Sequence, residues 1–172
     1  MNTTFAIIAS FQYWENYAFT EDGYLDTDNP YWKAKGGSEL VIAEGLSVSE
    51  VMSMGAEGIK KLVMDTVASS EEVANNGACQ YDLLDYVVEE RSEAVLVTIL
   101  DRIKEIASKE EHWMDLDYGY FVYSAPEIEL NEETVKWGLN ILKERGVITW
   151  DDEARYSYAR ISLTEEELEW VA

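Results

Sequence analysis

Cysteine, histidine and proline are scarce in this sequence, and each shortage excludes a class of structure. The single cysteine, Cys79, cannot form a disulfide within the chain or build a zinc site from several cysteines, which suits a reducing compartment. His112 is the only histidine, so a site in which one chain supplies two histidine ligands is excluded. Two prolines and ten glycines leave no room for a long flexible linker. The 172 residues are therefore expected to form a single domain, 1–172.

Long apolar runs are also missing. The longest spans residues 94–100 and contains a threonine, so it is too short to cross a bilayer. The first residues lack the basic segment of a signal peptide, and their apolar run is too short for one. We therefore expect a cytoplasmic protein with no membrane partner.

Positive charge is scarce as well. The chain has 13 Lys and Arg against 35 Asp and Glu, a formal net charge of -22. This charge repels nucleic acids and anionic membranes, and it attracts basic protein surfaces. A composition that is 47% hydrophobic and 12% aromatic distinguishes the chain from acidic disordered tails, which are poor in aromatic residues. The sequence therefore indicates a folded acidic protein.

The first part of the chain predicts an antiparallel sheet followed by helices. Strands are expected at 4–19, 31–35 and 38–43, with turn residues between the first two. A helix is expected from a cap at Ser47 or Ser49 to about Ser69. A long helix is predicted at 80–109 because apolar residues recur there at helical spacing. They are Leu84, Val88, Val95, Ile99, Ile103 and Ile106.

The last part predicts a helix, a β-hairpin and a short helix. After a strand at 118–123, Asn131 begins a helix that ends near Gly146. Strands at 147–150 and 156–163 form the hairpin, and a capping box at Thr164 starts the final helix. The predicted fold class is therefore α+β, with possible sub-structure: a sheet with helices at 1–117 and a helix–hairpin–helix part at 118–172.

Residues 133–171 resemble the last helix and wing of winged helix-turn-helix proteins. The matching runs are 139–148 and 161–164. The resemblance implies a DNA-binding shape, but a wing that contacts DNA needs Lys and Arg for the phosphates. Here the wing carries Asp151, Asp152 and Glu153 instead. The segment is therefore interpreted either as a protein-contact module or as a coincidence of layout.

Acidic residues of the predicted long helix form the first candidate site. Asp82, Asp85, Glu89 and Glu93 are separated by three or four residues, so on a helix they share one face. Carboxylates one turn apart, about 5.4 Å, are spaced on the scale of a phosphate backbone and suit Lys and Arg side chains that bind one. The alternative is a solvated helix face. The wing acids Asp151, Asp152 and Glu153 are the second candidate.

Two aromatic segments near the start form a further candidate surface. They are Trp14-Glu15-Asn16-Tyr17 and Trp32-Lys33-Ala34-Lys35-Gly36-Gly37. Together they resemble small acidic accessory proteins of tailed phages, of unknown function. This resemblance implies a phage accessory role without implying an activity. The rings and lysines could form a binding surface, or the rings could pack the sheet while the lysines face water.

The chain has few candidates for chemistry. His112, Asp115 and Asp117 could supply a hard-metal or mixed site, although a histidine at a helix end explains His112 equally. Cys79 has no histidine partner nearby in sequence, and the chain has no G-x-S-x-G motif. We therefore predict no catalytic residue and no cofactor.

These patterns favour a non-enzymatic protein that binds proteins. The specific hypothesis is a phage-encoded inhibitor that acts in the host cytoplasm and evades host defence. It would cover the basic surface of a nucleic-acid-binding host protein as a DNA mimic, without binding nucleic acid itself. A small carboxylate- or metal-dependent enzyme and a phage structural or assembly protein are the alternatives.

Overall fold

The computed structural model describes residues 2–74, 80–109, 116–117, 121, 129–150 and 160–163. The chain divides into two compact units at Glu89 and Glu90. We call Thr4–Glu89 the sheet unit, and the part that follows, from Glu90, the helix unit. The predicted sub-structure boundary after residue 117 lies inside the helix unit.

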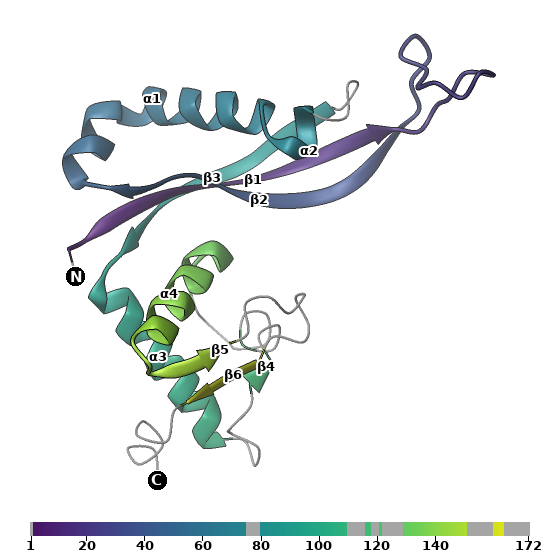
Figure 1. Cartoon of the computed structure of the whole chain (residues 1–172). Helices are drawn as coiled ribbons and strands as arrows, with labels where there is room; N and C mark the ends of the chain where they lie inside the picture. The colour runs from purple at the N-terminus through teal and green to yellow at the C-terminus, as the bar shows by residue number, and fades with distance from the viewer. Residues whose placement is uncertain are drawn as a thin grey trace. The chain divides into compact units, whose positions relative to one another are not determined.

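The sheet unit is built on a long β-ribbon. Strand β1, Thr4–Asn16, pairs antiparallel with β2, Trp32–Leu46, and β3, Gln80–Arg91, lies on the other side of β1. The order is β2-β1-β3, and β3 runs opposite to β1 (Figure 1). The strands expected at 31–35 and 38–43 are one strand, because Gly36 and Gly37 pair with β1 inside the ladder.

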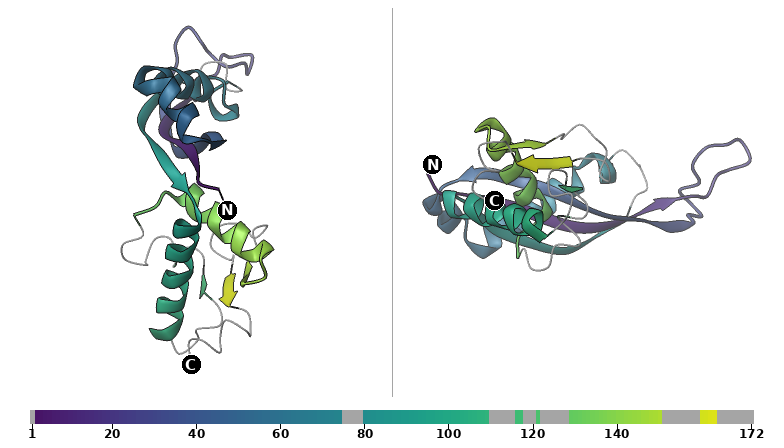
Figure 2. Two further views of the ribbon diagram at one scale, coloured as in Figure 1. Left: turned by 90° about the vertical axis from the view of Figure 1, so that its left-hand side faces the viewer. Right: turned by 90° about the horizontal axis from the view of Figure 1, so that it is seen from below.

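One face of this sheet carries helix α1, Val48–Ala68, as Figure 1 and the left view of Figure 2 show. Ser47 caps α1 as expected: its hydroxyl accepts from the Glu50 N–H, and the Glu50 carboxylate accepts from the Ser47 N–H at 2.8 Å. Gly55, at φ 62°, kinks the helix. A short helix α2, Glu71–Ala74, follows.

Alternation along β1 produces the core of the sheet unit. Every second residue of the strand faces α1, and α1 contributes apolar residues spaced three or four apart. The buried members of this core are Ile7, Ala9, Phe11, Ile59, Val63 and Val67.

The helix unit packs two helices on a small sheet. Helix α3, Glu93–Lys109, contacts α4, Glu132–Glu144, which begins at the predicted cap Asn131. The strands are β4, Leu116–Asp117, β5, Ile148–Trp150, and β6, Arg160–Leu163, in the order β4-β6-β5. The core residues are Leu96, Ile99, Ile103, Ile106, Phe121, Val135, Leu139, Leu142, Ile148, Trp150, Ile161 and Leu163.

These elements confirm the predicted α+β class, including the helix that ends before Gly146 and the antiparallel hairpin after it. The predicted helix at 80–109 is wrong in its first half, where β3 replaces it. Apart from Phe121, the predicted strand at 118–123 lies outside the described residues, as does the final helix. In the described part of the chain, no helix combines the length and apolar composition needed to cross a membrane.

Candidate protein-interaction surface

The acidic stripe predicted for a helix does not exist as a helical face. Asp82, Asp85 and Glu89 lie on β3, and only Glu93 belongs to α3. A strand replaces the helix because pairing with β1 and packing on the sheet-unit core involve Tyr81, Leu83 and Tyr86. Leu84, a member of the predicted apolar stripe, is 62% exposed as a result. Asp82 and Asp85 remain exposed, whereas Glu89 is half-buried.

Glu93 is engaged within the helix unit. Arg145, at the end of α4, donates from Nη1 to Glu93 Oε1 at 2.5 Å and from Nη2 to Oε2 at 2.9 Å. This bidentate hydrogen bonding holds the pKa of the Glu93 carboxyl below its ordinary value. The Glu93 carboxylate therefore already has a cation beside it. The contact links the start of α3 to the end of α4.

The other predicted site residues are only partly visible. Asp151, Asp152 and Glu153 lie outside the described residues, between the paired strands β5 and β6. His112 and Asp115 also lie outside them, and Asp117 is described only as a backbone partner of Arg160 in the small sheet. Within the described ranges, no group of three His, Cys, Asp or Glu residues could hold a metal ion. The metal hypothesis therefore remains a prediction.

A more informative surface is the connection between β1 and β2, residues 17–31, which we call the β1–β2 loop. Its base is fixed by Asn16, a buried residue at the end of β1. The Asn16 amide donates to the Asp26 carbonyl at 2.5 Å. Its Oδ1 accepts from the N–H groups of Ala18 and Tyr31, both at 2.9 Å. One side chain thus ties three points of the loop together.

The β1–β2 loop has further internal hydrogen bonds. Asp26 N–H donates to the Ala18 carbonyl at 2.9 Å, and Thr20 N–H donates to the Tyr24 carbonyl at 2.8 Å. The Asp26 carboxylate accepts from the N–H groups of Asp28 and Asn29, which forms a turn. The loop is therefore a second, smaller hairpin with a defined backbone.

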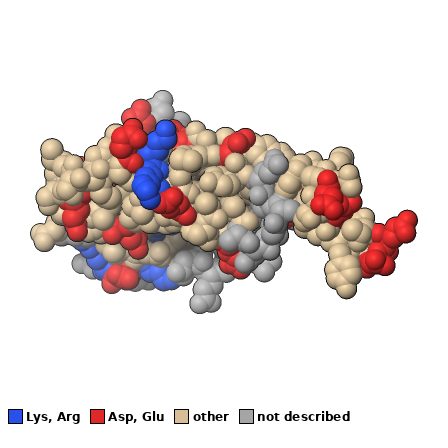
Figure 3. All heavy atoms as spheres, turned by 90° about the horizontal axis from the view of Figure 1, so that it is seen from above, with Lys and Arg blue, Asp and Glu red and all other residues tan. Residues whose placement is uncertain are grey.

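Large apolar side chains project from this loop into solvent. Tyr24 is 75% exposed and Phe19 is 63% exposed, and Tyr17, Leu25 and Tyr31 are exposed as well. Several exposed aromatic side chains within one loop make that loop a candidate interaction surface. Four carboxylates lie among them, and the loop contains neither Lys nor Arg; the four are Glu21, Asp22, Asp26 and Asp28. The loop lies at the right-hand end of Figure 3, where Asp and Glu (red) are visible and no Lys or Arg (blue) is.

Lys33, just beyond the loop, packs on two of its rings. Its Nζ lies 5.0 Å from the centre of the Tyr17 ring and 5.5 Å from that of Tyr31. The faces of these rings therefore accept a cation. Trp14 and Trp32, in β1 and β2, are half-buried. The rings of the first aromatic segments thus divide between the sheet and the exposed loop.

The sequence prediction identified residues 20–30 only as a loop. The signal that could have identified the surface is compositional: four aromatic residues and four acids occur within residues 17–31, without a base. Turn residues such as Gly23 and the pair Asn29-Pro30 predicted only that the backbone turns here.

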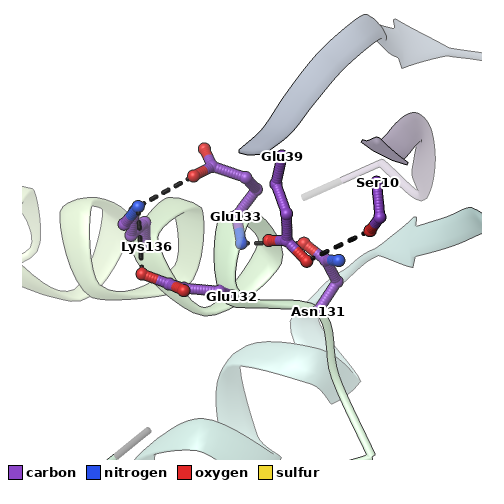
Figure 4. A network of polar contacts seen from close by, with 6 residues as sticks. All are labelled: Ser10, Glu39, Asn131, Glu132, Glu133 and Lys136. Atoms are coloured by element: carbon purple, nitrogen blue, oxygen red, sulfur yellow. Dashed lines mark hydrogen bonds and ion pairs between the residues drawn. The ribbon is translucent and has the colours of Figure 1, made fainter. Parts of the chain in front are cut away.

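Several of the described cations are engaged within their own unit. Lys136 contacts Glu133 at 2.8 Å and Glu132 at 3.2 Å (Figure 4). Burial lowers the pKa of the Lys136 ammonium, but these carboxylates outweigh burial and raise the pKa overall.

Figure 4 also shows the hydrogen bond within the sheet unit from Ser10 to Glu39, at 3.4 Å.

Comparison with known proteins supplies no relative. No family model matches the chain, and no curated protein or solved structure is significantly similar to it. The candidate surface therefore depends on the geometry and charge described above.

Proposed function

We propose that this chain is a non-enzymatic protein that binds a basic surface of another protein, where it takes the place of a nucleic acid. The resemblance to phage accessory proteins makes a host nucleic-acid-binding protein the proposed target, with inhibition as the outcome. The negative charge of this chain would speed its encounter with a basic surface, because opposite charges steer association.

The observation that carries this proposal is how the charges are used. Cations that could balance the acidic surface are taken up by local carboxylates or rings, whereas many acids remain exposed. Each ion pair also neutralises one carboxylate, so pairing leaves the net charge at -22, and the excess carboxylates set the charge that a partner meets. The engaged cations are Lys33, Lys61, Arg91, Arg102, Lys136 and Arg145.

The mimicry does not need the predicted helical row of acids. Asp82 and Asp85 stay exposed on β3, so they remain possible partner contacts, but Glu93 is held by Arg145. A target surface of Lys and Arg would meet carboxylates from strands and loops in place of one helix face.

Capture from a bacterial lysate tests the proposal. The full chain is immobilised, nuclease-treated lysate is passed over it, and bound proteins are identified and challenged with duplex DNA, single-stranded DNA or salt. We expect a nucleic-acid-binding protein that added DNA releases. We also expect release by salt, because the screening length of charge interactions falls from about 10 Å at about 0.1 M salt to about 3 Å at about 1 M.

A partner that ignores both DNA and salt would show that the contacts are not those of a nucleic-acid mimic. The proposal would also be contradicted if DNA released none of the captured proteins. The exposed carboxylates would then serve only to keep the surface hydrated.

A further inference from the structure

We propose that the β1–β2 loop is the part that enters the partner, and that it occupies a groove which otherwise holds single-stranded nucleic acid. This inference rests on the proposed function and names both the docking element and the class of target.

Exposed rings provide the first step. Residues that dominate binding are usually aromatic side chains that fill pockets in the centre of an interface. Tyr24 and Phe19 are the most exposed rings of the loop, at 75% and 63%, and neither belongs to the core of the sheet unit. Their burial by a partner would remove a large apolar area from water without disturbing the fold.

Charge supplies the second step. The groove that receives this loop must accept the carboxylates of Glu21, Asp22, Asp26 and Asp28, and residues 17–31 include no Lys or Arg. A groove with Lys and Arg on its walls has this complementarity. The contacts of Lys33 with Tyr17 and Tyr31 show that the rings of this segment also accept cations on their faces.

The combination of rings and carboxylates favours a single-strand groove over a duplex-binding surface. Proteins that bind single strands combine a positively charged groove with aromatic side chains on which bases stack. In that groove, rings of the loop can stand in for bases and carboxylates for phosphates. A surface for duplex DNA mainly contacts phosphates and groove edges, so exposed rings would gain little there.

The shape of the loop also suits a groove. Its two sides are joined by the antiparallel bridge between Phe19 and Leu25, so the loop is a narrow ribbon. Its backbone is also fixed before binding, through the hydrogen bonds of Asn16 and Asp26. A fixed backbone loses less conformational entropy on docking than a flexible loop would.

The test compares the loop with matched positions elsewhere in the sheet unit. Tyr24→Ala is paired with Met52→Ala, because Met52 on α1 is equally exposed, at 76%. A double variant Glu21→Gln with Asp22→Asn is paired with Glu57→Gln with Glu71→Gln, which removes the same charge from the exposed surfaces of α1 and α2. Each full-length variant is used for capture from nuclease-treated lysate, with oligothymidine and a duplex of equal length as competitors.

A photo-crosslinking amino acid locates the contact directly. Benzoylphenylalanine is placed at position 24 in one sample and at position 52 in another, and the crosslinked proteins are compared with and without each competitor. We expect crosslinks from position 24 that oligothymidine suppresses at lower concentration than duplex does. We also expect Tyr24→Ala to weaken capture about tenfold or more, as for loss of one stacked base, and Met52→Ala to leave it unchanged.

The outcomes separate this inference from the function on which it rests. If DNA still releases the partner but Tyr24→Ala has no effect, or crosslinks form only from position 52, the loop is not the docking element and the proposed function stands. If duplex competes as well as oligothymidine, the single-strand target is wrong. If no captured protein responds to either DNA, both proposals fail.

Discussion

Replacing Asn16 with alanine should loosen the β1–β2 loop without unfolding the rest of the sheet unit. The substitution removes one hydrogen bond to the Asp26 carbonyl and two from the N–H groups of Ala18 and Tyr31. At about 1 kcal/mol net for each, the loss is about 3 kcal/mol. Water can reach part of this region once the loop opens, so we expect about 2 to 3 kcal/mol.

The assay is hydrogen exchange measured amide by amide. The N–H of Asp26, which donates to Ala18, and that of Thr20, which donates to Tyr24, report on the loop without contacting Asn16 directly. A loss of about 2 to 3 kcal/mol in local opening free energy corresponds to exchange about 30 to 150 times faster. Amides of β1, the central strand of this sheet, should keep their protection.

Asn16→Asp is the control that separates donor from acceptor. The aspartate keeps an oxygen for the two N–H groups but, when ionised, cannot donate to the Asp26 carbonyl. Its effect should therefore be smaller than that of alanine, and it should shrink further at acidic pH, where the protonated carboxyl can donate. Equal protection of the loop amides in the wild type and in Asn16→Ala would refute the view that Asn16 organises the loop.

Two further predictions concern stability. In Gly138→Ala the new methyl would overlap the buried Ile99 side chain, so overpacking of about 1 to 3 kcal/mol should outweigh a helix gain of about 1 kcal/mol. In Gly58→Ala the methyl meets only ordinary contacts, so urea unfolding should show about 1 kcal/mol of added stability; shifts of the same sign would contradict this reasoning. Because Arg145 lowers the folded-state pKa of Glu93, this pair stabilises the fold above the ordinary Glu pKa and the effect is lost as pH falls through the folded value. Glu93→Gln should flatten that acid limb in unfolding measured against pH, and an unchanged curve would count against the pair.

The sequence predicted elements best where local signals agreed with tertiary packing. Ser47 and Asn131 cap helices at the predicted positions, since a capping side chain acts within one turn of the chain. The pair Gly36-Gly37 was misleading, because pairing with β1 carries the strand through both glycines. Local composition alone cannot show that a partner strand compensates for a weak strand former.

The predicted site failed for a similar reason. From Val95 onward the apolar period is that of α3, but Leu84 and Val88 continued it by chance into a strand. Both side chains are exposed on β3, and the same wrong period assigned Asp82, Asp85 and Glu89 to the helix. The β1–β2 loop was missed as a candidate surface because that role depends on which rings the fold leaves outside the core, and sequence spacing does not show this.

The order of the three strands has a consequence for self-association. In the described part of the chain no further strand pairs with the outer side of β2 or β3, so the sheet has two open edges. Open edges can extend from one molecule to the next. Asp82 and Asp85 on one edge strand and Glu44 on the other are exposed, so two copies that approached edge to edge would bring carboxylates together. Under the proposed function, the acidity that attracts a basic partner would thus also oppose pairing between copies of the chain, and we expect that restraint to weaken at high salt.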